Sequence, residues 1–141
     1  MAHYWWIAKR KFKLTAEDQI HEKDIIENEK WMNVVESDPT LYWFEETPHG
    51  KEMLEFCKKN GNEFSFKSSA HFQINKNWGH GGLQILLNRE GHYLSTLSSR
   101  ITTKRIEKLK EIANKLECKL FRNRTEIDDE KYQFFLGKYK T

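Results

Sequence analysis

Apolar residues between positions 101 and 116 recur three or four residues apart, which is the spacing of one face of an α-helix. The members of this stripe are Ile106, Leu109, Ile112, Ala113 and Leu116. Thr102 or Thr103 precedes the stripe and can accept a hydrogen bond from a backbone amide at the helix start. Glu111 and Lys115 are four residues apart, in the order that favours an ion pair. The pattern predicts an amphipathic helix with one face against a core.

After Leu116 the spacing changes from the period of a helix to the alternation of a β-strand. One side of this strand carries Cys118, Leu120 and Arg122, and the other carries Lys119, Phe121 and Asn123. A helix that leads into a strand with almost no linker is typical of a packed α/β or α+β unit and not of a helical bundle.

The longest alternating pattern spans residues 64–74 and predicts a strand with one apolar and one polar face. Its apolar side consists of Phe64, Phe66, Ala70, Phe72 and Ile74. Such strands are typical of an antiparallel sheet that is covered on one side. Further strands are predicted at residues 3–8, 41–44, 83–87 and 92–97, and further helices at residues 29–36, 48–59 and 128–139. Gly91 is expected to supply a left-handed residue between two of these strands.

These elements predict one α+β domain over residues 1–141, with a mainly antiparallel sheet and helices packed largely on one face. The helix at 48–59 draws its apolar face from Met53, Leu54, Phe56 and Cys57. Residues 9–28 interrupt the pattern because they are highly charged. They fit either a short helix that begins near Thr15 or a mobile insertion.

The composition says more about the cellular compartment of the protein than about its function. The chain has 141 residues, enough for one domain with its own core, and a net charge of +3. Aromatic residues make up 13% of it, so its core need not rely on disulfides. The two cysteines, Cys57 and Cys118, are predicted to be small buried residues in a reducing compartment. Without a signal-peptide pattern or a long apolar run, we expect a cytoplasmic protein that does not enter a membrane.

The histidines are the first candidates for chemistry. His71, His80 and His92 surround the middle strands, but their spacing matches no metal-binding motif. A hydrolase or nuclease built on them is the weakest of three functional hypotheses. The serines lack a nucleophile elbow, and the acidic residues form no recognisable acid–base pair. We therefore expect no metal site, no cofactor and no enzymatic activity.

Two features are better suited to binding. The loop Trp78–Gly82 joins an aromatic ring and the imidazole of His80 to three glycines, yet it lacks a phosphate-binding pattern. Adjacent aromatic residues occur at 4–6 and at 42–44, and neighbouring strand side chains point to opposite faces. Some of these rings must therefore lie off the main core face, either under a helix or in a contact with a partner.

The basic residues are concentrated between Arg100 and Arg124. Lys104, Lys108 and Lys115 share one face of the predicted helix, and Arg122 and Arg124 follow in the strand and turn. Such a surface can bind phosphates, which makes a nucleic-acid-binding module the alternative functional hypothesis. The competing interpretation is a solvated helix exterior in which basic and acidic residues pair with one another.

Three segments carry a resemblance to a known group of proteins. The segment Glu29–Leu41 resembles a Glu-Trp, Val-x-x-Asp-Pro-x-Leu pattern of small uncharacterised bacterial α+β proteins. The helix at 108–118 and the acidic residues Asp128–Glu130 are similar to later segments of those proteins. Where they have a glycine-rich strand, this chain has Phe121-Arg122-Asn123-Arg124. Some members look like immunity proteins encoded beside secreted toxins, and the resemblance supplies no catalytic residues.

The leading hypothesis is therefore a non-enzymatic protein-binding domain. The resemblance implies an immunity protein that neutralises a toxin encoded nearby by occluding its active site. The candidate partner-binding residues are Trp43, Trp78, His80, Lys104, Lys108, Arg122 and Arg124.

Overall fold

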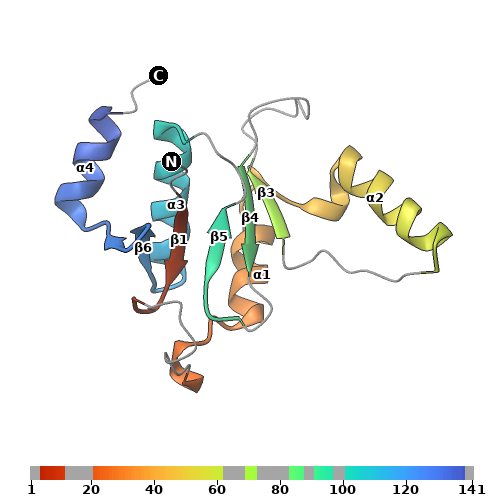
Figure 1. The fold of residues 1–141 in the computed structure, drawn as a ribbon, viewed down its shortest axis with the longest axis horizontal. Coiled ribbons are helices and arrows are strands. Elements are labelled where there is room, and N and C mark those ends of the chain that lie inside the picture. Colours follow the sequence, from red (N-terminus) through yellow and green to blue (C-terminus); the bar gives the residue numbers. More distant parts are fainter. Residues whose placement is uncertain are drawn as a thin grey trace.

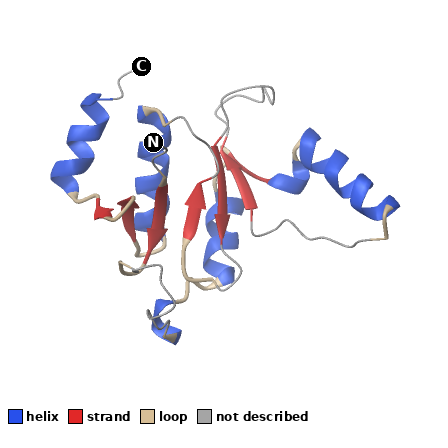
Figure 2. Ribbon diagram, viewed as in Figure 1, coloured by secondary structure: helices blue, strands red, loops and turns tan. Residues whose placement is uncertain are grey.

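The structure, a computed structural model, describes residues 4–11, 21–61, 69–72, 83–87, 91–96 and 101–138, the side chain of His49 excepted. The strands are β1 (Trp5–Ala8), β2 (Leu41–Trp43), β3 (Ser69–Phe72), β4 (Leu83–Leu87), β5 (Leu94–Thr96), β6 (Lys119–Arg122) and β7 (Thr125–Glu126). The helices are α1 (Asn28–Ser37), α2 (Pro48–Lys59), α3 (Thr103–Lys115) and α4 (Asp129–Lys138), with short 3-10 turns η1 (Glu22–Asp24) and η2 (Phe44–Glu46). Figure 1 and Figure 2 show their arrangement.

The strands form one seven-stranded antiparallel sheet in the order β2-β3-β4-β5-β1-β6-β7. The first strand of the chain thus lies inside the sheet, where Trp6 is opposite Ser95 of β5 on one side and Phe121 of β6 on the other. Helices α1 and α3 lie behind the sheet in Figure 1, and α2 extends away from its β2–β3 edge. The predicted α+β class and the largely antiparallel sheet are confirmed.

The main core lies between the sheet and the helices. Trp5 and Ile7 point into it from β1, and Trp31 of α1 is fully buried there. Helix α3 contributes the predicted stripe, of which Ile106, Leu109, Ile112, Ala113 and Leu116 are all buried. Helix α4 packs beside α3, and its Phe135 meets the ring of Trp5 edge-on with 5.4 Å between ring centroids.

A second, smaller cluster lies on the opposite face of the sheet. Trp6 and Ala8 alternate with the core residues of β1 and join Phe121 of β6. The indole of Trp6 stacks on Phe121 with 4.3 Å between centroids and 16° between planes, and Tyr93 meets it edge-on. The Trp6 indole N–H donates a hydrogen bond of 2.7 Å to the backbone oxygen of Asn123. The predicted alternation of Leu120 and Phe121 is therefore real, and both sides are buried.

Local sequence signals explain where the helices begin. The Thr102 hydroxyl accepts a hydrogen bond from the backbone N–H of Arg105 at the start of α3. The Thr47 hydroxyl does the same for the N–H of Gly50 at the start of α2, where Pro48 occupies a position that requires no amide hydrogen bond. Gly91 has a φ of 80°, as predicted for a left-handed residue.

Two predicted segments are described only in part. Of the strand at 64–74 the structure describes Ser69–Phe72, and the rest lies outside the described residues. Of the charged segment 9–28, residues 12–20 lie outside them too. The described end of that segment is packed: Ile26 is buried in the core, and the buried carboxylate of Asp24 lies 3.1 Å from the guanidinium Nε of Arg10.

The contribution of the second cluster to stability can be tested by substitution. We expect Phe121→Ala to lower the free energy of unfolding by about 3–5 kcal/mol, because it leaves a cavity beside Trp6. Phe134→Ala is the matched control, since this ring on α4 is 63% exposed, and it should change stability by less than about 0.5 kcal/mol. Urea unfolding of both variants measures the difference. Equal effects would show that the cluster is not part of the folded core.

Candidate functional site

Of the aromatic candidates from the sequence, the structure describes one, and its ring is buried. Trp78 and His80 lie outside the described residues. Trp43 is only 4% exposed, and its ring meets Trp31 of α1 edge-on with 6.3 Å between centroids. Trp43 therefore belongs to the main core, whereas Trp6 is the ring of the adjacent aromatics that is buried on the opposite face of the sheet. One part of Trp43 nevertheless lines a surface groove, described below.

Lys108 stabilises the fold through contacts with two carboxylates of the same chain. Its Nζ lies 2.6 Å from Asp38 Oδ2 and 2.9 Å from Glu111 Oε2, and its side chain is 11% exposed. Burial alone lowers the pKa of Lys108, but the hydrogen bonds to Asp38 and Glu111 outweigh it and raise the pKa. Burial likewise raises the pKa of Asp38, and the hydrogen bonds from Lys108 and Thr40 outweigh it and leave the pKa lowered. Both groups are therefore charged at neutral pH.

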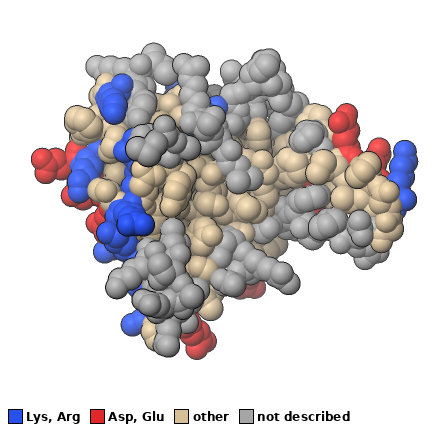
Figure 3. All heavy atoms as spheres, in the orientation of Figure 1, with Lys and Arg blue, Asp and Glu red and all other residues tan. Residues whose placement is uncertain are grey.

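Most other cations of the basic stretch also have intramolecular contacts. Lys115 pairs with Glu111 at 3.3 Å, and Lys119 pairs with Glu126 at 3.4 Å. The Arg122 guanidinium lies 5.0 Å from the ring centroid of Phe135. Within the described part of the chain, the exposed residues Lys104 and Arg124 have no ion-pair partner. Figure 3 shows Lys and Arg gathered over the side that α4 and β6 occupy, with Asp and Glu beside them.

The histidines do not form a centre among the residues that can be placed. His71 lies in β3 opposite Tyr42 and Gln84 of the neighbouring strands. His92 is buried and meets Tyr93 edge-on at 4.8 Å. No three His, Cys, Asp or Glu side chains of the described residues are grouped so that they could hold a metal ion.

The two cysteines differ from the buried pair that the pattern predicts, since each is only partly buried. Burial raises the pKa of the Cys118 thiol to about 11. The thiol is therefore protonated at neutral pH, and it is a poor nucleophile because thiolates are the reactive form.

Helix α2 is where the structure departs most from expectation. Its apolar stripe forms as predicted, but Phe56 is 64% and Met53 39% exposed, while Leu54 and Cys57 are partly buried. Among the described residues α2 packs mainly on η2. A β-carbon on Gly50 would lie 1.7 Å from the carbonyl oxygen of Phe44, so only glycine allows this approach. The helix is thus held at its first turn and presents an apolar face to solvent.

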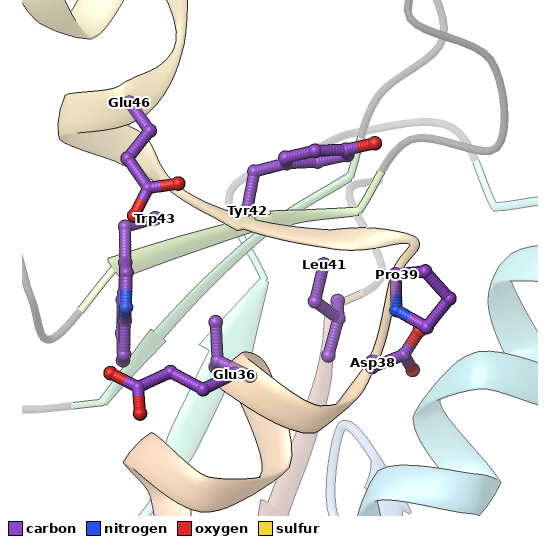
Figure 4. A pocket seen from close by; sticks show the side chains of 8 residues that line it. Glu36, Asp38, Pro39, Leu41, Tyr42, Trp43 and Glu46 are labelled. Atoms are coloured by element: carbon purple, nitrogen blue, oxygen red, sulfur yellow. The ribbon is translucent and has the colours of Figure 1, made fainter.

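A groove of about 290 Å³ lies next to the base of α2, between β2, the end of α1 and η2. Its lining residues are Val35, Glu36, Asp38, Pro39, Leu41, Tyr42, Trp43 and Glu46. Figure 4 shows the carboxylates of Glu36 and Glu46 at opposite ends of Trp43, with Leu41 and Pro39 across the groove from its ring. No local sequence motif predicts this groove, because its acidic residues come from α1 and η2 and line the same groove only in the folded chain.

No helix in the described residues is long and apolar enough to cross a membrane. Comparison of the chain with models of protein families, with curated protein sequences and with solved structures gives no match. The resemblance to immunity-like bacterial proteins therefore stays a prediction, and functional argument has to start from the surface formed by α2 and the groove.

The ion pair between Lys108 and Asp38 can be tested by substitution. We expect Lys108→Met to lower the free energy of unfolding at pH 7 by about 3–5 kcal/mol, because it leaves the Asp38 carboxylate buried without its partner. Lys115→Met is the control on the same helix. It breaks a pair whose side chains are 42% and 47% exposed, and should cost at most about 1 kcal/mol. Urea unfolding measures both losses.

The ion pair also predicts how the stability difference between the wild type and Lys108→Met changes with pH. The lowered pKa of Asp38 stabilises the wild-type fold above the ordinary carboxyl value of 3.8, and this contribution is lost as the pH falls through the lowered pKa. In Lys108→Met the hydrogen bond and the charge of Lys108 no longer lower the pKa of Asp38, so protonation of Asp38 destabilises the variant less than the wild type. The stability gap between the two proteins should therefore narrow below about pH 5. A gap that stays constant down to pH 3 would contradict the assignment.

Proposed function

We propose that this chain is a protein-binding domain without catalysis of its own, and that α2 is its principal contact surface. The observation that supports the proposal is the exposed apolar stripe of α2, with Phe56 64% and Met53 39% exposed. An amphipathic helix normally buries such a stripe, and an aromatic ring with a methionine beside it is a common composition for the centre of a protein interface.

The energetics favour a partner on this surface. A helix of 12 residues is marginal in water without tertiary packing, and α2 packs mainly on η2 within the described residues. Complete burial of a side chain such as Phe or Met contributes about 1.5–3 kcal/mol. A partner that covers Phe56 and Met53 would therefore supply both binding energy and the packing that α2 needs to be ordered.

The basic stretch supports the alternative, nucleic-acid binding, less well. Binding to DNA or RNA draws its affinity from several simultaneous phosphate contacts. Lys108, Lys115 and Lys119 are each within ion-pair distance of a carboxylate of the same chain. A nucleic acid would have to compete with these contacts, whereas a protein on α2 displaces only water.

The resemblance of Glu29–Leu41 and the helix at 108–118 supplies the kind of partner to test first, a toxin encoded by the neighbouring gene. An immunity protein acts by occlusion, so it needs an exposed surface and no active site. The proposed role of α2 fits that requirement, because it projects from the β2–β3 edge of the sheet (Figure 1).

Co-expression with the product of the neighbouring gene tests the proposal. We expect a stable 1:1 complex on size-exclusion chromatography at about 1 μM. Phe56→Asp should weaken it at least about tenfold, because it places a charge in the apolar contact. Phe134→Asp is the matched control, since Phe134 is 63% exposed on α4, and it should leave the affinity within about twofold.

Three results would overturn the proposal. The first is a folded wild-type chain that forms no complex at this concentration. The second is a complex that Phe56→Asp and Phe134→Asp weaken equally, which would place the contact elsewhere. A chain that instead self-associates through Phe56 would show that the partner is a second copy and that no foreign protein is recognised by α2.

A further inference from the structure

A backbone carbonyl next to β2 holds the first turn of α2 in place. The Phe44 oxygen accepts hydrogen bonds from the Thr47 backbone N–H at 3.1 Å and from the Thr47 hydroxyl at 2.7 Å. The same hydroxyl accepts a hydrogen bond from the Gly50 N–H at 3.0 Å, and Thr47 is buried. One buried hydroxyl therefore connects η2 to α2. We call Phe44, Thr47 and Gly50 the α2 joint.

Gly50 allows a contact in this joint that no other residue would allow. A β-carbon at this position would lie 1.7 Å from the Phe44 oxygen and 2.6 Å from the Phe44 carbonyl carbon. Both are backbone atoms, so they cannot rotate aside as a side chain would. Pro48 lies between Thr47 and Gly50, and its ring restricts φ to about −65°. The direction in which the chain enters α2 is therefore closely restricted.

The α2 joint is connected to the core on one side and to the exposed stripe on the other. Phe44 directly follows Trp43, which is buried in the main core and pairs with Ala70 of β3. Phe56 lies six residues after Gly50, about 9 Å along the helix axis. Among the described residues α2 packs mainly on η2, so a change of angle at the joint would move the Phe56 ring.

We propose that Thr47 and Gly50 are positioning residues of the contact surface, which fix the direction of α2 relative to the sheet and so orient Phe56 and Met53 toward the partner. The role of these two side chains rests on the proposed function, but the fixed direction of α2 does not. The first turn is the unfavourable step in helix formation. Because the joint forms that turn before binding, the partner has to order only the outer turns, and this favours affinity.

The substitution Gly50→Ala separates the formation of α2 from its direction. Alanine favours a helix more than glycine does, so the circular dichroism of the variant should show no loss of helix. In the ¹⁵N-labelled wild type, the residual dipolar couplings of residues 48–55 should fit the alignment tensor of the strands. In Gly50→Ala they should not, because the β-carbon forces the first turn away from Phe44. Gly137→Ala in α4 is the matched control, since a β-carbon there meets no atom within 4 Å.

The affinity for the neighbouring-gene product measures the effect on the contact surface. Gly50→Ala should weaken the complex at least about tenfold, and Gly137→Ala should leave it unchanged. Thr47→Val should weaken it about fivefold, because valine is similar in shape but loses both hydroxyl hydrogen bonds. Thr47→Ser keeps the hydroxyl and should restore the affinity to within about twofold of the wild type, which a role in packing alone would not explain. The Thr47 pair decides the test if Gly50→Ala does not fold.

The inference fails if residues 48–55 of the wild type do not share the alignment tensor of the strands, or if Gly50→Ala leaves the direction of α2 unchanged. An oriented wild-type α2 without a complex with the neighbouring-gene product would refute the proposed function and leave the fixed direction of α2 standing. A complex that Phe56→Asp weakens, but Gly50→Ala and Thr47→Val do not, would refute the positioning role and leave the proposed function standing.

Discussion

The position of β1 inside the sheet is the constraint on which the rest of the fold depends. All four of its residues pair with β6 on one edge, and Trp6 and Ile7 pair with β5 on the other, and both partner strands lie far along the chain. Without β1 the sheet would divide into β2–β5 and β6–β7. Strand β1 also connects the two hydrophobic clusters, because Trp5 packs into the main core on one face of the sheet and Trp6 packs into the second cluster on the other face. Such long-range pairing has to form before either cluster can be buried completely, which favours slow folding.

The proposed binding surface lies at the β2 edge of the sheet, whereas β1 lies inside it. Two contacts hold this region in place: the Thr47 cap with the close approach of Gly50 to Phe44, and the ion pair of Lys108 with Asp38. The second joins α3 to the turn that forms one wall of the groove, and Thr40 donates two further hydrogen bonds to Asp38. The buried pair therefore has a second effect besides stability, since it holds the Pro39 turn across from Trp43.

Periodicity is sufficient to predict the helices, because each is long enough to show its own repeat. Most strands are too short for that, and their positions follow from β-prone composition and flanking turns as well. The strand order was not predictable in this way, since the pairing of β1 with β6 depends on residues more than a hundred positions apart. The same limit explains Lys108. It shares a helix face with Lys104 and looks like a surface cation, but its partner Asp38 is 70 residues away in the sequence. Local spacing carries no information about such a partner.

The apolar stripes show a further limit. Those of α2 and α3 are equally clear in the sequence, but only that of α3 lies under the sheet. An amphipathic pattern shows that one face of a helix is apolar and favours burial. It does not show whether that face is buried by the same chain or by a partner. The groove cannot be predicted from the sequence for a related reason. Glu36 and Glu46 belong to different elements, and they line the same groove as Trp43 only in the folded chain.

Among the described residues α2 packs mainly on η2 near its first turn, and this has a consequence for how the protein can change over time. Because Met53, Glu55 and Phe56 lie on the exposed part of the helix, their replacement alters the outer surface while the main core is untouched. Mutations there should therefore change the free energy of unfolding less than mutations in the core, where the loss of stability limits which substitutions a small domain tolerates. The architecture thus separates the residues that keep the chain folded from those that would decide what it recognises, and descendants of this chain can acquire new specificities without first acquiring extra stability.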